Sequence, residues 1–400
     1  MIRHSTFVIS HFVIFPVISM YRPLWIEIDL NALRGNFKTI KSSLAKDVKV
    51  IATIKQQAYG HGLIPIAREL SYLGVDYFGV GSLEEAISLR ENGFKEKILA
   101  LSAILPCFAE EVLQYNIVPT VGEINFAKAL NKTAAKHNKI IAVHVKVDTG
   151  MGRLGLHYDE ALGLIGELSK LKNISLEGLY THFPAADTDP DFTNYQINLF
   201  NRLITILKNA NISFKYQHCA NSLGVIHYPH SHFNLVRPGL ILYGIKPSPR
   251  MPLDLRPVLS LKSKIIFTKK IKKGMSVSYG RTFVAKKSIN VATVSIGYAD
   301  GYPWSLANNA KIIIKDKFFN LIGRVCMDHI MVNLGDESCV KIADEVILIG
   351  KKNNLAISAE DVASWAKTIP YEIVSRLSLK IPRLYKNASQ KQLHFLKEKF

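Results

Sequence analysis

The organisation of the chain follows from residues 48–62, which read VKVIATIKQQAYGHG. The first half is apolar and β-branched, which is typical of a strand buried on both faces of a parallel sheet. Lys55 stands where that strand would pass into a glycine-containing turn. Desolvation at such a position lowers the pKa of a lysine amine and makes the amine nucleophilic. Lys55 is therefore a candidate for covalent attachment of a carbonyl cofactor, although a lysine that simply reaches water at the sheet edge would give the same pattern.

Seven more apolar runs follow this strand, and amphipathic stretches with helical spacing lie between them. The expected strands span 48–55, 76–80, 98–101, 118–121, 141–147, 176–182, 216–220 and 233–236. Expected helices include 29–44, with Asp29 as N-cap, 83–92 and 159–171. Strands that alternate with helices eight times predict an α/β fold, a parallel (β/α)8 TIM-like barrel, over residues 20–257.

The pattern changes after Pro257. Short strand-like runs at 259–267, 288–296, 311–321, 325–334 and 345–348 are separated by turns, and one helix is expected at 358–367. Ser358 and Asp361 have the spacing of a capping box at its start. Residues 258–400 are therefore expected to form a mostly β C-terminal domain.

Residues 1–19 include an apolar run that superficially resembles a signal peptide. His11 and Pro16 interrupt it, no small-residue cleavage site follows, and the run is too short to span a bilayer. We expect a dispensable N-terminal extension, with Met20 as the natural start; an exported, periplasmic form is the alternative.

The composition narrows the range of partners. The 400 residues are 48% hydrophobic and carry a formal net charge of +19, which raises nucleic acid or a membrane surface as partners. The lysines are spread along the chain, however, and no nucleic-acid motif accompanies them, so neither partner is expected. Four scattered cysteines suggest neither disulfides nor a metal site, and a reducing cytoplasm is the expected location.

Polar residues gather where the expected barrel strands end, which is where barrel enzymes place their active sites. They are Lys55, Lys146, Asp148, Arg153, His182, His218, Asn221, Ser222 and Arg237, and the backbone N–H groups near Gly239 lie among them. Taken singly, a histidine here is more often a core residue and an arginine more often a surface ion pair. Their common position at strand ends favours a functional site, with phosphate held after strands seven and eight.

Several motifs resemble those of alanine racemases, the barrel-type enzymes that use pyridoxal 5′-phosphate. Besides residues 55–62, they are VKVDTGMGRLG at 145–155, EGLYTHF at 177–183, ANS at 220–222, VRPG at 236–239, VSYG at 277–280, IGYADG at 296–301 and GRVCMD at 323–328. They follow the family's order over residues 22–385. Gln56 and Gln57 depart from the family, which usually has Ala-Asn there.

The resemblance implies a role for each matched residue. Lys55 would hold pyridoxal phosphate covalently and act as one catalytic base, and Tyr279 would be the other. The cofactor phosphate would be bound by Tyr59, Ser222, Gly239, Leu240 and Tyr371, with Asn221 beside them. His182 would pack against the cofactor ring, Arg237 would face its pyridine nitrogen, and Arg153 its phenolic oxygen. Tyr298, Met327 and Arg153 would bind substrate, supported by His218, Asp328 and a Lys146 that family members carry as a carbamate.

The implied reaction interconverts L- and D-alanine by two opposed bases and supplies D-alanine for peptidoglycan. Tyr279, Tyr298 and Met327 would reach the barrel of a partner subunit, so a homodimer with shared sites is expected. Three alternatives stay open: a broader-specificity amino-acid racemase, a basic-amino-acid decarboxylase of the same barrel type, and a regulatory pyridoxal-phosphate-binding protein.

Overall fold

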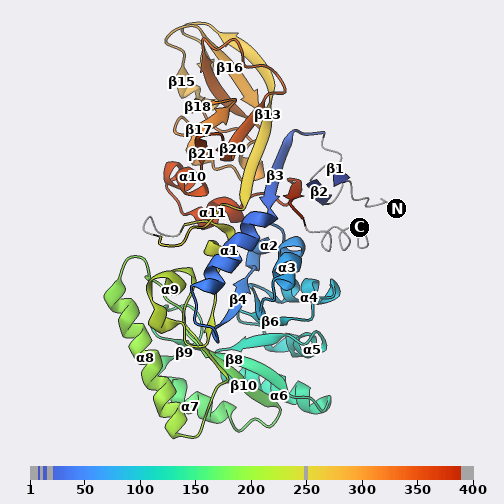
Figure 1. The fold of residues 1–400 in the computed structure, drawn as a ribbon, viewed down its shortest axis with the longest axis vertical. Helices are drawn as coiled ribbons and strands as arrows, with labels where there is room; N and C mark the ends of the chain where they lie inside the picture. The colour runs from blue at the N-terminus through green and yellow to red at the C-terminus, as the bar shows by residue number, and fades with distance from the viewer. Residues whose placement is uncertain (1–7, 10–11, 16–20, 247–250, 389–400) are drawn as a thin grey trace.

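The computed structural model describes residues 8–9, 12–15, 21–246 and 251–388. It has two lobes stacked along the long axis, a barrel below and a β-rich domain above (Figure 1). The expected start at Met20 and most of the 1–19 extension lie outside the described residues.

The lower lobe is the expected parallel barrel. Its eight strands are β4 (Lys49–Thr53), β5 (Tyr77–Val80), β6 (Lys97–Ala100), β7 (Val118–Val121), β8 (Ile141–Asp148), β10 (Ile174–Tyr180), β11 (Tyr216–His218) and β12 (Leu235–Val236). They pair in the order β11-β10-β8-β7-β6-β5-β4-β12, and β9 (Leu156–His157) pairs with β8. Arg237 N donates to Ala220 O at 2.9 Å just beyond the ends of β12 and β11, which closes the ring at the C-terminal ends of the strands.

Helices cover the outside of the barrel (Figure 1). They are α1 (Leu30–Ser42), α3 (Leu63–Tyr72), α4 (Leu83–Glu91), α5 (Ala109–Gln114), α6 (Ile124–Lys136), α7 (Tyr158–Leu168), α8 (Pro190–Asn209) and α9 (Ser222–His227). Asp29 caps α1 as expected, because its carboxylate accepts from the backbone N–H groups of Asn31 and Ala32. The apolar faces of these helices and strands form one continuous core that also extends into the second domain.

The upper lobe is mostly β, as expected. Its main strands are β13 (Leu259–Ile271), β16 (Ile289–Val294), β17 (Lys311–Ile314), β18 (Lys317–Ile322), β19 (Ile330–Gly335), β20 (Glu345–Lys352) and β21 (Leu355–Ile357), with a small β14 (Ser276–Val277) and β15 (Phe283–Val284) sheet. The sheet curls into a ring because β20 pairs with β13 as well as with β17. Helix α10 (Ala359–Ala366) starts at the expected capping box of Ser358 and Asp361.

Two expected strands of this lobe were wrong in detail. Residues 311–321 form a hairpin rather than one strand, because Lys315 adopts a left-handed φ of 52° and reverses the chain. The run expected at 325–334 becomes a strand only at Ile330; the residues before it form a loop.

Segments from both ends of the described chain join the upper sheet. Strand β3 (Leu24–Asp29) pairs with β13, and β22 (Arg383–Lys386) pairs with β3. Beyond β22 lie two short strands of the N-terminal extension, β1 (Val8–Ile9) and β2 (Phe12–Phe15), of which β2 pairs with β22. The sequence pattern had not indicated any of these four strands.

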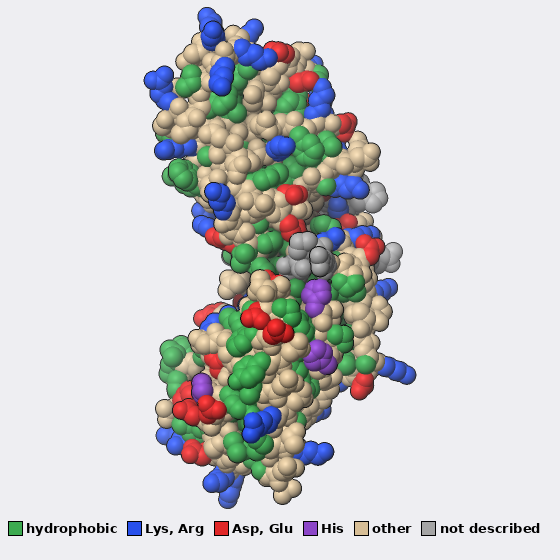
Figure 2. All heavy atoms as spheres, turned by 90° about the vertical axis from the view of Figure 1, so that its left-hand side faces the viewer, with side chains coloured by type: hydrophobic (Ala, Val, Ile, Leu, Met, Phe, Trp, Pro, Cys, Tyr) green, Lys and Arg blue, Asp and Glu red, His purple; other side chains and the backbone are tan. Residues whose placement is uncertain are grey.

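The surface carries its positive charge in a dispersed way on the face shown in Figure 2, where Lys and Arg side chains are spread over both lobes. No helix in the described part of the chain is long and apolar enough to cross a membrane.

Candidate active site

The turn after β4 has an unusual backbone. Helix α2 (Lys55–Tyr59) begins with Lys55, but the four residues after it, Gln56 to Tyr59, all have φ of 53°. This single left-handed turn is costly for side-chain-bearing residues, at about 1–2 kcal/mol each. Backbone strain of this kind persists only where surrounding contacts hold it, and it is concentrated at functional sites.

His61 supplies one such contact from inside the turn. Its ring is fully buried, and its Nδ1 donates to the carbonyl oxygens of Ala58 and Tyr59, both at 2.9 Å. The His61 ring also stacks on Tyr243, with 4.4 Å between ring centroids. Burial lowers the pKa of His61 to about 4, so the ring is neutral near pH 7.

Glu85, in the first turn of α4, also holds this turn. One carboxylate oxygen accepts from Gln57 N at 3.0 Å and the other accepts from Gly81 N at 2.9 Å. A Cβ on Gly81 would lie 3.2 Å from Lys55 Cβ, so the ends of β4 and β5 meet closely here. The Glu85 bridge therefore fixes the loop on which Lys55 stands.

Lys55 lies in the environment that a nucleophilic amine needs. Burial lowers the pKa of its amine, the positive charge of Arg153 lowers it further, and only Glu85 acts in the opposite direction. The amine is thus easier to deprotonate than an exposed lysine. This agrees with the expectation from its strand-end position.

Tyr59, Ser222 and Gly239 come together to form a small cradle. Gly239 N donates to Ser222 Oγ at 3.0 Å, and a Cβ on Gly239 would lie 2.7 Å from the Tyr59 hydroxyl. Asn221 shapes the cradle by capping α9 through Gly224 N. Leu240 follows Gly239 at the start of a 3₁₀ turn. The ring of Tyr371, on α11 (Pro370–Ser375), lies 6.2 Å from that of Tyr59, so the second domain also contributes to this side.

A directed chain of hydrogen bonds begins at Arg237, which is buried. Its guanidinium donates to His218 Nδ1 at 2.6 Å, and His218 Nε2 lies 2.9 Å from His144 Nδ1. Because a guanidinium cannot accept a hydrogen bond, both histidines must carry their proton on Nε2. His144 Nε2 then lies 3.8 Å from the Glu177 carboxylate. Burial would raise the pKa of Glu177, but His144, Lys97 and Tyr77 hold it at about 2.

His182 lies at the mouth of the barrel beside the same arginine. Its Nδ1 is 3.3 Å from an Arg237 terminal nitrogen, which also donates to the Thr181 and Cys219 carbonyl oxygens. Burial and then the positive charge of Arg237 hold the pKa of His182 well below its usual value. The ring is therefore neutral and accepts a hydrogen bond.

Lys146 is a buried lysine with excess positive charge around it. It is 3% exposed on β8. Burial, followed by the charges of Arg153 and Arg237, lowers the pKa of its amine to about 8. Asp148 does not neutralise it by direct pairing, because its carboxylate accepts from the backbone N–H groups of residues 150–152 and shapes the turn that leads to Arg153.

Tyr279, Tyr298 and Met327 are not part of this cluster. They lie on loops of the upper lobe and are 70%, 44% and 54% exposed. Among the described residues, none of the three is hydrogen-bonded to the barrel residues named above. The chain therefore brings the barrel residues together and leaves these three side chains exposed.

Sequence reasoning missed Glu85, His144 and Glu177. Glu85 was detectable, since Ser82 and Glu85 have capping-box spacing directly after the second strand, and Ser82 Oγ does accept from Glu85 N. His144 lies inside an apolar strand, and Glu177 lies in the middle of another, so nothing in either local pattern marks them.

The residues present fit pyridoxal 5′-phosphate. Lys55 offers an amine of lowered pKa. Because Gly239 has no side chain, there is room beside the hydroxyl groups of Tyr59 and Ser222. Arg237 offers a buried hydrogen-bond donor. Hydroxyl and backbone N–H donors suit a phosphate group.

Comparisons with known proteins agree with this arrangement. The alanine racemase N-terminal domain model matches residues 28–247 and the C-terminal domain model matches residues 258–385. The alanine racemase of Halothermothrix orenii is 41% identical over 369 residues, which cover 92% of this chain and 97% of that protein. That of Clostridium tetani is 41% identical over 370 residues, covering 91% and 95%.

Solved structures of alanine racemases have the same fold. The enzyme of Clostridium difficile 630 superposes with a TM-score of 0.87 at 37% identity, covering 92% of this chain and 96% of that one. The Bacillus anthracis enzyme with bound L-Ala-P gives a TM-score of 0.87 at 33% identity, covering 93% and 97%. The chain belongs to the alanine racemase family of isomerases.

Proposed function

We propose that this enzyme interconverts L- and D-alanine with pyridoxal 5′-phosphate, using Lys55 and Tyr279 as opposed bases. The observation that carries the proposal is the placement of Lys55, an amine of lowered pKa on a strained turn, next to the cradle of Tyr59, Ser222 and Gly239. Lys55 would hold the cofactor covalently, and Tyr59, Ser222, Gly239, Leu240 and Tyr371 would bind its phosphate.

When bound, the cofactor would withdraw electron density from the substrate α-carbon and so make its C–H bond acidic. Arg237 would donate a hydrogen bond to the pyridine nitrogen without giving up its proton, because a guanidinium stays protonated. The terminal nitrogens of Arg237 donate hydrogen bonds to His218, Thr181 and Cys219, and these bonds fix the orientation of the guanidinium. This arrangement limits electron withdrawal and so disfavours side reactions.

Proton transfer would take place on two faces of the substrate. Once the substrate amine has replaced it on the cofactor, Lys55 would be a free neutral amine and would remove the α-proton of one enantiomer. The Tyr279 hydroxyl would deliver a proton to the opposite face. The roles are exchanged in the reverse direction. Arg153, Tyr298 and the Met327 backbone would orient the substrate, and a carbamate on Lys146 would hold Arg153 in place.

The Tyr279 assignment requires a second chain. Tyr279 is 70% exposed on its own subunit, so its hydroxyl is free to enter a site on a neighbouring copy. We therefore infer a homodimer in which each site combines the barrel of one subunit with Tyr279, Tyr298 and Met327 of the other. The four free cysteines fit the predicted cytoplasmic location, and the D-alanine formed is proposed to enter peptidoglycan.

The direct test is to measure conversion of L-alanine by chiral chromatography, with the cofactor removed and then restored. We expect equal final amounts of the two enantiomers and strict dependence on pyridoxal phosphate. Racemisation assays with serine, arginine and lysine distinguish a broad-specificity racemase from an alanine racemase. Release of carbon dioxide from any of these amino acids would identify a decarboxylase. Cofactor binding without turnover of any amino acid would favour a regulatory protein. Growth that depends on added D-alanine after gene deletion tests the peptidoglycan role.

A further inference from the structure

Tyr298 and Met327 belong to two loops that are joined by their backbones. Tyr298 N donates to Cys326 O at 3.0 Å, and Ala299 N donates to Met327 O at 3.1 Å. The fit is tight, since a Cβ on Gly297 would lie 2.1 Å from Met327 O. Displacing one loop must therefore displace the other.

Asp300 closes the first of these loops. Its side chain is only 8% exposed, and its Oδ2 accepts from Gly297 N at 2.9 Å. Its backbone carbonyl accepts from Ser378 N at 3.0 Å, which ties the loop to the segment after α11. A carboxylate this deeply buried requires a positive partner.

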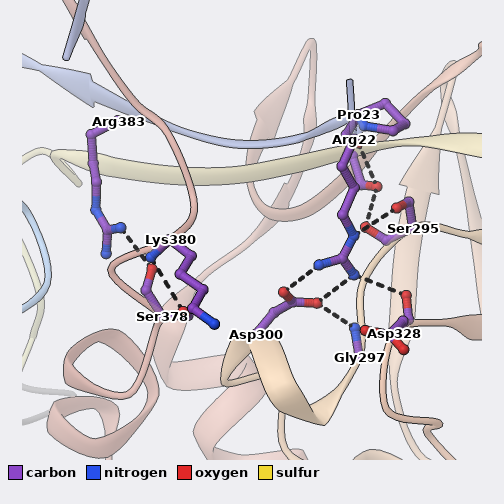
Figure 3. A network of polar contacts seen from close by, with 10 residues as sticks. Arg22, Pro23, Ser295, Gly297, Asp300, Asp328, Ser378, Lys380 and Arg383 are labelled. Carbon is purple, nitrogen blue, oxygen red and sulfur yellow. Dashed lines mark hydrogen bonds and ion pairs between the residues drawn. The ribbon is translucent and has the colours of Figure 1, made fainter. Parts of the chain in front are cut away.

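That partner is Arg22, just ahead of β3 (Figure 3). Its two terminal nitrogens bind the two Asp300 carboxylate oxygens at 2.6 and 2.7 Å. The same guanidinium donates to Asp328 O at 3.0 Å, directly after Met327, and its Nε donates to Ser295 Oγ at 3.1 Å. One side chain thus binds both loops.

The backbone next to Arg22 is itself fixed. Pro23 O accepts from Ser263 Oγ at 2.9 Å and from Lys264 N at 3.1 Å, so the residue after Arg22 is anchored on β13. The guanidinium therefore acts from a rigid support and not from a free chain end.

We propose that Arg22 is a positioning residue that fixes Tyr298 and the Met327 backbone as one substrate-facing unit. The proposal rests on the proposed function, because it takes these two residues as the substrate contacts. Among the described residues, Arg22 makes its side-chain hydrogen bonds to Ser295, Asp300 and Asp328 and none to the barrel residues proposed to bind the cofactor. Its loss should therefore change substrate affinity while leaving cofactor binding intact.

Only an arginine can make this set of contacts. Binding both carboxylate oxygens, a carbonyl and a hydroxyl at once uses the planar fork and the Nε–H of a guanidinium. A lysine keeps the charge but has a single nitrogen, which cannot span Asp300, Asp328 O and Ser295. Arg22→Lys is therefore the sharpest variant, since it tests geometry at constant charge.

The matched control is Arg34→Lys. Arg34 also pairs with a buried carboxylate, Glu69, at 2.6 Å, and it also donates to a carbonyl oxygen near the end of the described chain, that of Asn387. It lies on α1, away from the two loops. Both variants replace a guanidinium that binds a buried carboxylate and a carbonyl oxygen, so both should lower the melting temperature, but only Arg22→Lys should disturb Tyr298 and Met327.

Two measurements decide the proposal. In Arg22→Lys, KM for both alanine enantiomers should rise about tenfold, since a small displacement of a binding group weakens binding by such factors. The change in kcat should be smaller, and the affinity for pyridoxal phosphate should be unchanged. Hydrogen exchange at the amides of Gly297, Tyr298 and Ala299 should accelerate in Arg22→Lys and not in Arg34→Lys. Asp300→Asn should reproduce both effects, and it replaces Arg22→Lys if that variant does not fold.

An unchanged KM in the folded variants, or exchange at residues 297–299 no faster than in Arg34→Lys, would overturn the proposal. The exchange measurement needs no catalysis. A parent enzyme that fails to racemise alanine would therefore disprove the proposed function, while exchange would still decide whether Arg22 fixes the loops.

Discussion

Lys55 is the residue on which the proposed chemistry depends, because none of the other residues in the cradle offers an amine at that position. Lys55→Ala should abolish the visible absorbance of bound pyridoxal phosphate and nearly all racemisation. The fold should survive, since the side chain is only partly buried and the turn is held by His61 and Glu85. Absorbance and full activity in the folded variant would show that another lysine holds the cofactor.

Lys146 carries a second prediction, because a carbamate forms only on a neutral amine. With the Lys146 pKa lowered to about 8, a substantial fraction is neutral near that pH and little is neutral below pH 6. Labelled carbon dioxide should give a carbamate signal in nuclear magnetic resonance at pH 8, and Lys146→Ala should lose both the signal and most activity. Added acetate, which restores a negative charge, should recover part of that activity.

A bare amine at pH 8 in the parent protein, or full activity of Lys146→Ala, would contradict the prediction for Lys146. The matched control is Lys97→Ala. Lys97 also pairs with a group inside the barrel, Glu177, but lies at the start of its strand, whereas Lys55, Ser222 and Arg237 follow the ends of theirs. Its loss should leave the carbamate signal in place.

The grouping of candidate residues at strand ends could be predicted from the sequence, whereas contacts between segments far apart in the sequence could not. Lys55, Ser222 and Arg237 follow strands, and parallel register brings strand ends together whatever the intervening sequence. Arg22 gives no such signal, since its partner Asp300 lies 278 positions away in the sequence. Only the folded pairing of β3 with β13 brings the two side chains into contact.

At the scale of elements, the left-handed turn at residues 56–59 was not predictable. Gln, Ala and Tyr have no preference for positive φ, so the conformation is imposed by tertiary contacts. The eight barrel strands, by contrast, were predicted in number and order, because apolar runs alternate regularly with amphipathic helices. The hairpin at residues 311–321 was missed because Lys315 and Asp316 form its turn without a glycine.

The turn yields a prediction about Glu85, whose two oxygens hold the backbone of Gln57 and Gly81. In Glu85→Gln one of the two carboxylate oxygens becomes an N–H donor that faces a backbone N–H group. The loss of this hydrogen bond should destabilise the turn by about 1–3 kcal/mol. Cofactor affinity should fall about tenfold or more, and the Lys55 pKa should fall further, because Glu85 is the charge that raises it. Titration with the cofactor measures its affinity, and the pH dependence of covalent attachment measures the Lys55 pKa.

Glu84→Gln makes the same chemical change one residue earlier on the exposed face of α4. It should leave both quantities unchanged. Equal effects in the two variants would mean that the loss of helix N-terminal charge, rather than the bridge to the turn, explains the result.

For the whole molecule, the buried neutral histidines predict sensitivity to acid. His61, His144 and His218 all have lowered pKa values in the fold, so the unfolded chain binds more protons below its pKa of about 6.5. The free energy of unfolding should therefore fall as the pH decreases from about 6.5, down to about 4 for His61, by up to about 1.4 kcal/mol per pH unit for each histidine.

Urea unfolding at a series of pH values measures this slope. His61→Asn supplies the matched variant, because its amide N–H can replace the donor to Ala58 and Tyr59 without titrating. The variant should show a shallower slope between pH 4 and 6.5. An identical slope would remove His61 from the explanation.

The shared site is the prediction that tests the proposed assembly of two copies. Lys55→Ala cannot hold the cofactor covalently, and Tyr279→Phe lacks one base, so each homodimer should be inactive. A mixed dimer would contain one site with both defects and one site with neither, because the native Tyr279 of the first subunit would face the native Lys55 of the second. Co-refolding the two variants should therefore restore about one quarter of the parent activity, since about half of the dimers are mixed and each has one native site of two.

The expected recovery of activity in mixed dimers follows from the exposure of Tyr279. Tyr279 is 70% exposed on its own chain and stands on a loop held by Ser278, whose hydroxyl donates to Arg324 O at 2.7 Å. The loop is thus anchored, while the Tyr279 side chain stays exposed. Mixing the variants without refolding is the control for subunit exchange. Absence of activity in verified mixed dimers would assign Tyr279 to the site of its own chain, since a defect confined within each subunit cannot be complemented by its neighbour.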